Sequence, residues 1–231
     1  MNTQIKVLII VTSHATLGST GKPTGYYLPE VSHPYAALVA HGFSVDIASP
    51  AGGKAPLDQS SLDLKDPINR TFWEDKVARG KLENTLKLAD IDPRVYRGIF
   101  YAGGHGTMWD FREDSASKRL AREIYEAGGV VAAVCHGPAA LVDVKLSDGK
   151  YLVAGKKVGA FSDAEEKAIK LEGIVPFFVE SALVEHGAIY SKADVWQQHV
   201  VVDGRLVTGQ NPASASGVGE AMADVLQQVA R

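Results

Sequence analysis

The one cysteine of this chain, Cys135, is followed directly by a histidine, a glycine and a proline. The apolar run at residues 130–134 fits a buried strand, so the thiol stands where a strand meets a sharp turn. A strained strand-to-helix turn holds a nucleophile out of the fold, and the positive end of the next helix would favour the thiolate. His136 places a base beside that thiol, as nucleophilic catalysis requires. The pattern predicts a nucleophile elbow with a catalytic cysteine rather than a structural core cysteine.

Other residues that could take part in catalysis follow further expected strands. Glu30 opens an apolar helix, where a carboxylate is either functional or a simple N-terminal charge. Gly104 permits close backbone approach and offers an N–H for an oxyanion hole. His105 either binds substrate or is simply a capping or solvated histidine of its loop. Asp163 and Glu166 lie three residues apart, so they either cap a helix or orient the histidine beside the thiol. The spacing alone does not separate these alternatives.

Strand-like and helix-like patterns alternate along the chain. This alternation predicts an α/β fold, doubly wound and flavodoxin-like, with a mainly parallel sheet and helices on both faces. In such sheets a ligand binds outside the carboxyl ends of the strands, so the scattered candidates should converge there. The expected strands are 5–11, 43–48, 98–102, 130–134 and 157–161, and the expected helices are 31–42, 116–127, 175–186 and 218–229. Asp203-Gly204 predicts a hairpin between 200–202 and 206–208, and Asn211-Pro212 predicts a helix N-cap.

Composition limits the class of protein. The 231 residues are 45% hydrophobic and 22% charged with a net charge of −3, so no basic face indicates nucleic acid or an anionic membrane. A single cysteine excludes an internal disulfide framework. The sequence shows no leader peptide, no apolar stretch of about 20 residues and no dinucleotide or phosphate-loop motif after a strand. We expect a cytoplasmic enzyme of one domain, residues 1–231, with an irregular insertion or lid around 50–95 and no cofactor.

Several segments together carry a resemblance to a known family. The run from Ala132 to Ala139 around the cysteine resembles the signature of the ThiJ/PfpI superfamily. Residues 24–30 with His33-Pro34, residues 102–107, and residues 203–214 resemble its glutathione-independent glyoxalase branch, glyoxalase III, whose small members are also described as stress chaperones. These matches cover nearly the whole chain.

The resemblance implies roles by position. Cys135 matches the nucleophile, Glu30 the acid that hydrogen-bonds the thiol, and His136 its neighbouring histidine. Glu166 matches the acidic third member in small members of the branch, whereas Asp163 matches the position that larger members use. The N–H groups of Gly104 and His136 match the oxyanion hole. The metal-binding residues of larger members have no clear counterpart, so we predict no metal.

The resemblance further implies conversion of methylglyoxal, or another small 2-oxoaldehyde, and water to lactate through a cysteine hemithioacetal. His136 or Glu30 is the candidate base. The enzyme would be a lyase of the D-lactate dehydratase type that needs neither nicotinamide nor glutathione, and a homodimer. Four aromatic residues would either close an apolar pocket or simply pack: Tyr26, Tyr27, Trp109 and Phe111.

Other activities remain open on the sequence. A protein deglycase would use the same thiol on glycated side chains, and a holdase chaperone would need an exposed apolar patch of several hundred Å². A cysteine peptidase would need an open groove. A class I glutamine amidotransferase also has a cysteine elbow, but the distant His-Pro-Glu of that family is missing here.

Overall fold

A mostly parallel sheet forms the centre of the molecule. The computed structural model describes residues 4–229, so the first three residues of the expected leader-free N-terminus lie outside it. Within this range seven strands pair in the order β3-β2-β1-β4-β5-β9-β8, and all pairs except β8–β9 are parallel. The strands are β1 Lys6–Ile10, β2 Ser44–Ser49, β3 Leu86–Lys87, β4 Gly98–Tyr101, β5 Val130–Val134, β8 Val200–Asp203 and β9 Leu206–Gly209. The doubly wound α/β fold is thereby confirmed.

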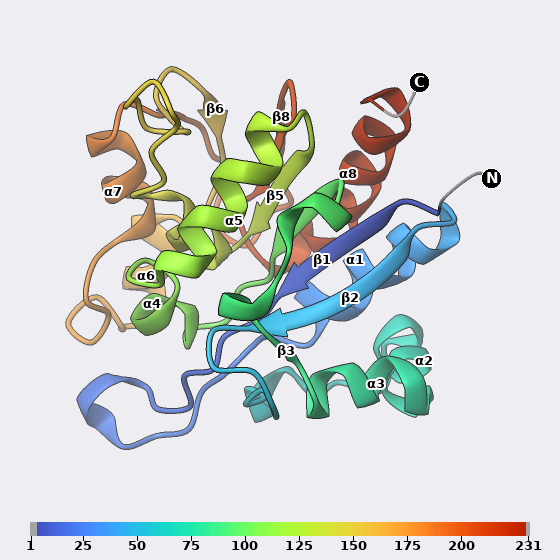
Figure 1. The fold of residues 1–231 in the computed structure, drawn as a ribbon. Helices are drawn as coiled ribbons and strands as arrows, with labels where there is room; N and C mark the ends of the chain where they lie inside the picture. The colour runs from blue at the N-terminus through green and yellow to red at the C-terminus, as the bar shows by residue number, and fades with distance from the viewer. Residues whose placement is uncertain (1–3, 230–231) are drawn as a thin grey trace.

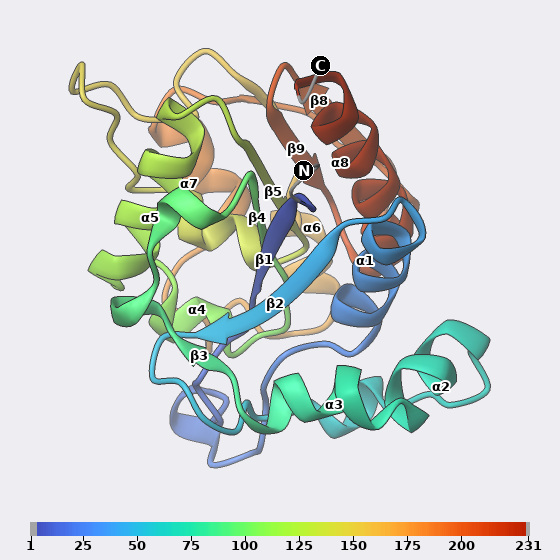
Figure 2. The same cartoon turned by 45° about the vertical axis from the view of Figure 1, so that its right-hand side comes forward.

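Helices cover both faces of this sheet because its central strands β1, β4, β5 and β9 are buried on both sides. In β1, Leu8 and Ile10 face one buried cluster, whereas Val7 and Ile9 face the other. Figure 2 shows α5, Ser115–Glu126, on one side of the sheet, with α1, Pro29–Ala40, and α8, Ala215–Val229, on the other. Figure 1 shows α5 in front of the strands and α1 behind them.

The segment around 50–95 is built of short elements, each with a local reason. Asp66 and Asp75 accept N–H bonds at the starts of α2, Pro67–Glu74, and α3, Lys76–Glu83, as helix N-caps do. Strand β3 then extends the central sheet beside β2. The 3-10 helices of this segment are Gln59–Ser61, Leu88–Asp90 and Pro93–Val95. The segment therefore contributes to the sheet itself, and only part of it lies near the candidate site.

Several expected elements differ in extent. The strand expected at 157–161 is only β6, Lys157–Val158, and it pairs with β7, Ile189–Tyr190, outside the main sheet. The helix expected at 175–186 is α7, Val179–Glu185, because Pro176 and the two phenylalanines after it remain non-helical. The remaining helices are α4 Thr107–Asp110, α6 Asp163–Ala168, and the 3-10 helices Gly18–Thr20, Gly137–Leu141 and Pro212–Ser214.

Asn211 lies at the N-cap position of the 3-10 helix Pro212–Ser214, with Pro212 at its start, as the sequence predicted. Its side chain makes no capping bond to the 3-10 turn that follows. Instead, its amide donates to the Glu165 carboxylate at 2.8 Å and to the Gln197 carbonyl at 2.8 Å. Asn211 therefore precedes a short helix, as expected, while its side chain joins three segments behind the candidate site.

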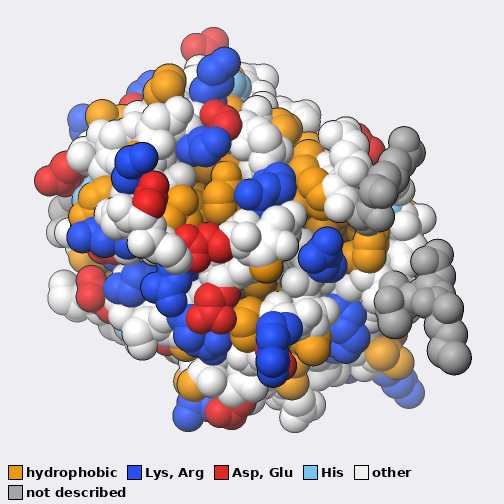
Figure 3. All heavy atoms as spheres, turned by 45° about the horizontal axis from the view of Figure 1, so that its top comes forward, with side chains coloured by type: hydrophobic (Ala, Val, Ile, Leu, Met, Phe, Trp, Pro, Cys, Tyr) orange, Lys and Arg blue, Asp and Glu red, His pale blue; other side chains and the backbone are white. Residues whose placement is uncertain are grey.

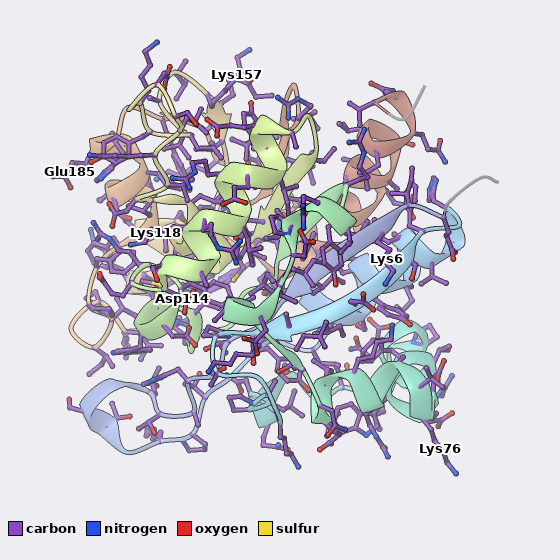
Figure 4. The ribbon with its side chains drawn as sticks, viewed as in Figure 1. Lys6, Lys76, Asp114, Lys118, Lys157 and Glu185 are labelled. Atoms are coloured by element: carbon purple, nitrogen blue, oxygen red, sulfur yellow. The ribbon has the colours of Figure 1, made fainter. Side chains whose placement is uncertain are left out.

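Charged side chains occupy the outside of the molecule. Figure 4 shows Lys76, Lys157 and Glu185 at the edge of the ribbon, pointing away from it. On the face drawn in Figure 3, positive and negative side chains are interspersed with hydrophobic ones. Among residues 4–229, no helix has the length and apolar character needed to cross a bilayer.

Candidate active site

The backbone of Cys135 adopts a conformation that L-amino acids rarely take, with φ at +60°. Its N–H donates to the Gly209 carbonyl at the end of β9 at 3.0 Å, and its carbonyl accepts the Phe161 N–H at 2.8 Å. A Cβ at Gly137 would collide with the Tyr101 backbone, so the turn needs glycine there. The strained turn is fixed from two sides, which is the nucleophile elbow expected from the sequence.

A cysteine, a histidine and a glutamate form a continuous chain of contacts. His136 Nδ1 lies 3.3 Å from Cys135 Sγ, and His136 Nε2 lies 2.7 Å from Glu166 Oε2. All three side chains are buried. A carboxylate accepts the proton on Nε2, so Nδ1 is left free to accept the thiol proton. The arrangement matches that of a nucleophile, a base and an orienting acid.

Glu166 also contacts a second histidine. His105 Nε2 lies 2.9 Å from Glu166 Oε1, and the rings of His105 and His136 are 4.1 Å apart between centroids. The side chain of His105 is partly exposed, whereas that of His136 is buried. One carboxylate thus orients both imidazoles. Of the two, His105 is the one that is partly exposed.

A second carboxyl group, Glu30, lies on the other side of the thiol in the first turn of α1. Its Oε2 accepts the Gly103 N–H at 2.8 Å, whereas its fully buried Oε1 has no hydrogen-bond partner within residues 4–229. A Cβ at Gly103 would collide with this carboxyl group, so glycine permits the close approach. Glu30 therefore keeps one oxygen available beside Cys135.

The two glutamates are driven to opposite protonation states. Burial raises the pKa of Glu30 to about 8, against smaller opposing contributions from the neighbouring Cys135 thiol and the Gly103 N–H. The pKa of Glu166 falls to about 2 because its contacts with His136 and His105 outweigh the effect of burial. Glu30 is thus mostly protonated at neutral pH and able to donate, whereas Glu166 is ionised.

Burial also acts on the thiol and on its base. It lowers the pKa of His136 to about 4, so the imidazole is neutral at pH 7 and can accept a proton. Burial, followed by the charge of Glu30, raises the pKa of Cys135. The N–H of His136 at the start of the 3-10 turn lowers the pKa of the thiol, as expected of a helix start, but burial and Glu30 outweigh it. Deprotonation of the thiol consequently depends on His136 rather than on a helix dipole.

A cavity of about 320 Å³ opens over the thiol. The backbone N–H groups of Gly104 and His136 donate to no oxygen acceptor within residues 4–229, and both residues border this cavity. Gly104 has φ at +103°, and a Cβ there would collide with the backbone of residues 25–27. The Gly104 N–H is therefore available to an anionic oxygen formed at the substrate, and the His136 N–H, which lies beside the Cys135 sulfur, is the second candidate donor.

The same histidine pair and glutamate are spaced as metal ligands. One ligand atom each from His105, His136 and Glu166 lies within 4.8 Å of the others. In the structure these atoms hydrogen-bond to one another, and the bonds already account for the positions of all three side chains. We predicted no metal from the sequence, and that expectation stays a prediction.

The match to known proteins covers most of the chain. Residues 24–224 match the DJ-1/PfpI family. The chain belongs to the DJ-1/PfpI family. The resemblance noted in the sequence is thereby confirmed.

Within the DJ-1/PfpI family, several similar proteins are named as glyoxalases. Glyoxalase 3 of Candida albicans is 33% identical over 94% of this chain and 96% of the relative. Glutathione-independent glyoxalase HSP31 of Saccharomyces cerevisiae is 35% identical over 96% of this chain and 98% of the relative. The crystal structure of glyoxalase III from Candida albicans superposes with a TM-score of 0.89 at 30% identity, covering 96% and 97% of the two chains.

The structure brings together most residues that the sequence singled out. Glu30, Gly104, His105, Cys135 and His136 all border one cavity, and Glu166 contacts both histidines behind it. Because the carboxyl ends of β4 and β5 are neighbours, their loops meet there, as is usual for this DJ-1/PfpI sheet.

The two candidates for the acid are separated by their contacts. Glu166 reaches the His136 ring, whereas Asp163 Oδ2 accepts a hydrogen bond from the Ser181 hydroxyl. Asp163 and Glu166 both lie on α6, which begins at Asp163, but their side chains contact different partners. Asp163 therefore does not touch the histidine.

The four aromatic residues proposed for the pocket lie in different places. Of the four proposed for the pocket, only Tyr27 lines the cavity over the thiol. Tyr26 borders a different cavity, Phe111 lies in the core, and Trp109 stacks on His14 with ring centroids 5.2 Å apart.

Sequence analysis did not find the residues that shape the outer part of the cavity. Trp196 borders it from a loop with no motif, and Asp58 and Ser60 reach it from the irregular segment around 50–95. Glu165 is buried next to Glu166 and holds this loop. Only the Asn211 motif pointed towards this region, because its side chain contacts Glu165.

Glu30→Gln should change how stability depends on pH. Above pH 4.5 an ordinary glutamate is ionised in the unfolded chain, whereas native Glu30 keeps its proton until about pH 8. Its raised pKa therefore stabilises the native state most below pH 4.5, and this contribution is lost as the pH rises to 8. Between pH 5 and 8 the free energy of unfolding of Glu30→Gln should rise relative to wild type by on the order of 4 kcal/mol.

Urea denaturation at both pH values measures this difference. Glu172→Gln is a matched control because the Glu172 side chain is exposed. An equal difference between Glu30→Gln and wild type at pH 5 and pH 8 would show that Glu30 does not hold a proton in the native state.

Proposed function

We propose that this protein is a glutathione-independent glyoxalase that converts methylglyoxal and water to lactate. The observation that carries the proposal is the contact of Cys135 Sγ with His136 Nδ1 at 3.3 Å in a cavity flanked by protonated Glu30. The names of the Candida and Saccharomyces relatives support the same activity.

The first step is addition of the thiol to the aldehyde. His136 Nδ1 takes the proton from Cys135, and the sulfur bonds to the aldehyde carbon. The electron pair of the carbonyl moves to its oxygen, which the N–H groups of Gly104 and His136 stabilise. His136 then passes this proton to the oxygen, which gives a neutral hemithioacetal and leaves His136 neutral again.

The second step moves hydrogen within the substrate. The former aldehyde carbon loses its hydrogen as a proton to neutral His136, the electron pair shifts towards the ketone oxygen, and this oxygen takes a proton from Glu30 to give an enediol. Protonation at the neighbouring carbon and loss of the hydroxyl proton give a thioester. One carbon is oxidised by two electrons and the other is reduced by two, so no external oxidant, nicotinamide or glutathione takes part.

Hydrolysis completes the cycle. Water adds to the thioester carbon, the carbon–sulfur bond breaks, and the thiol recovers its proton as lactate leaves. Reprotonation of the enediol from one face sets the hand of the product, and we infer the D form, which corresponds to a lyase of the D-lactate dehydratase type. Chiral analysis of the lactate tests the hand, and L-lactate would contradict it.

We also propose that the protein works as a homodimer in the cytoplasm. A single, buried cysteine without a disulfide partner suits a reducing compartment. An apolar groove between α1 and α2, which includes Val39 with nearly half of its surface exposed, offers contact area on the outside of the fold. Analytical ultracentrifugation at micromolar concentration tests the assembly, and a monomer would contradict it.

Cys135→Ser should abolish methylglyoxal turnover while the protein stays folded. A serine hydroxyl has too high a pKa to supply the nucleophile that a thiol supplies. Lactate production without glutathione measures the activity, and circular dichroism confirms the fold. Retention of most of the turnover would exclude the covalent route.

Cys135→Ala separates the other candidate activities. A holdase chaperone would keep suppressing the aggregation of a client protein in this variant. A deglycase would lose the release of adducts from glycated side chains together with the thiol. Wild-type protein that does not form lactate from methylglyoxal would overturn the proposed function.

His136→Ala should reduce kcat for methylglyoxal by at least about 100-fold, the usual scale for loss of a general acid–base group. The variant should still be alkylated at Cys135 because the cavity remains, although more slowly, since His136 no longer takes the thiol proton. His41→Ala is a matched control, since His41 lies at the end of α1 in contact with Glu220 and far from the thiol in the fold. An unchanged kcat in His136→Ala would leave Glu30 as the only base.

A further inference from the structure

The cavity over Cys135 is larger than methylglyoxal needs. Methylglyoxal is about the size of three water molecules, which together occupy roughly 90 Å³ at ~30 Å³ each. The cavity has a volume of about 320 Å³. After the two carbonyl groups are placed between the thiol and the N–H donors, most of this space remains for the rest of a substrate.

The additional space is bordered by apolar side chains. Besides the polar groups at the thiol and Thr24, Asp58 and Ser60, the walls are aliphatic or aromatic. The apolar side chains include Leu17, Pro23, Phe161, Ile169, Leu171, Trp196 and Pro212. A substituent without hydrogen-bonding groups would bury its surface there at no cost in unpaired polar atoms.

Aromatic rings extend in a row from the catalytic histidine to the surface. The centroids of His136 and Phe161 are 4.2 Å apart, and those of Phe161 and Trp196 are 5.9 Å apart. Phe161 is buried, whereas Trp196 is 45% exposed. A large aromatic side chain left open at the mouth of a cavity has apolar surface available for a ligand ring at a favourable distance.

The Trp196 wall is formed before any ligand arrives. Its backbone lies in the left-handed region with φ at +65°, which is unusual for a residue with a large side chain. Its N–H donates to the buried Glu165 Oε1 at 2.9 Å, and the Asn211 amide donates to the same oxygen at 2.8 Å. Glu165 Oε2 also accepts from Ser162 at the start of α6. These bonds fix the loop to α6 and thereby hold the tryptophan at the cavity mouth.

We propose that the cavity walls formed by Phe161, Trp196 and Leu171 are a subsite for the carbon substituent of the substrate, and that the enzyme takes 2-oxoaldehydes with aromatic substituents in addition to methylglyoxal. The inference rests on the proposed glyoxalase activity and specifies its substrate class. The two carbonyl groups bind at the thiol, and the ring stacks against the aromatic row. No change in the bond-making steps is needed.

The test compares two substrates across matched variants. In wild-type protein, kcat/KM is measured for phenylglyoxal and for methylglyoxal, with mandelate and lactate as products. In Trp196→Ala, the ratio of the phenylglyoxal to the methylglyoxal value should fall about 10-fold, since an aromatic pair contributes about 0.5–1.5 kcal/mol beyond its buried area. Comparing this ratio between wild type and variant cancels the difference in intrinsic reactivity between the two aldehydes.

Two further variants make the result specific. Trp196→Phe keeps a ring at this position and should restore most of the ratio, which excludes a general loss of folding as the cause. Trp73→Ala removes a tryptophan that borders a different cavity and should leave the ratio unchanged.

The outcomes separate the two proposals. A ratio that stays the same in Trp196→Ala, with methylglyoxal still turned over, would overturn the subsite and leave the glyoxalase function in place. Absence of turnover of both aldehydes by wild-type protein would overturn the function itself. A fall in the ratio that Trp196→Phe reverses supports the subsite.

Discussion

The structure depends on one strained residue at the carboxyl edge of the sheet. Cys135 can hold a left-handed backbone only because β9 accepts its N–H and residue 161 donates to its carbonyl. The second of these bonds also sets where the chain returns, and Ser162 through Glu166 follow directly from it. The position of the orienting carboxylate is therefore a consequence of how the thiol is held, although the two lie 31 residues apart in the printed sequence.

Burial gives the candidate site its chemistry through two carboxyl groups in opposite states. Glu30 has one neutral hydrogen-bond donor and an unpartnered oxygen, so removal from water favours its protonated form. Glu166 is equally buried, yet two imidazoles bind its oxygens and favour the anion. A proton donor and a fixed negative charge thus lie on either side of the thiol and its base. The same side-chain type supplies both because the partners differ, which is how many sites assign acid and base roles.

The fold and the thiol end of the site could be predicted from the sequence because their signals are local. The apolar run before Cys135 and the glycines after β4 are short-range features, and parallel strands bring their ends together. The choice between Asp163 and Glu166 needed the direction of each side chain along one turn of helix, which spacing alone does not give. β6 failed as a central strand because a short apolar run does not indicate its pairing partner.

The outer cavity could not be predicted for a different reason. Trp196 is placed by bonds to Glu165, a residue 31 positions away in sequence and without an apolar pattern of its own. No local sequence pattern indicates that a carboxylate is buried by hydrogen-bond partners from three separate segments. The Asn211-Pro212 pair does start a short 3-10 helix, but the tertiary contacts of the Asn211 amide could not be predicted from that motif.

Glu165 and Glu166 are neighbours on α6 but have different contacts. Glu165 anchors the loop that carries Trp196, and Glu166 orients the histidines. A displacement of this short helix would therefore change the mouth of the cavity and the alignment of the base at the same time. For anyone who redesigns the enzyme, the helix should be left intact. Useful variation belongs in the side chains that border the cavity from elsewhere, such as Leu17 and Leu171, where volume can change while α6 keeps its anchoring bonds.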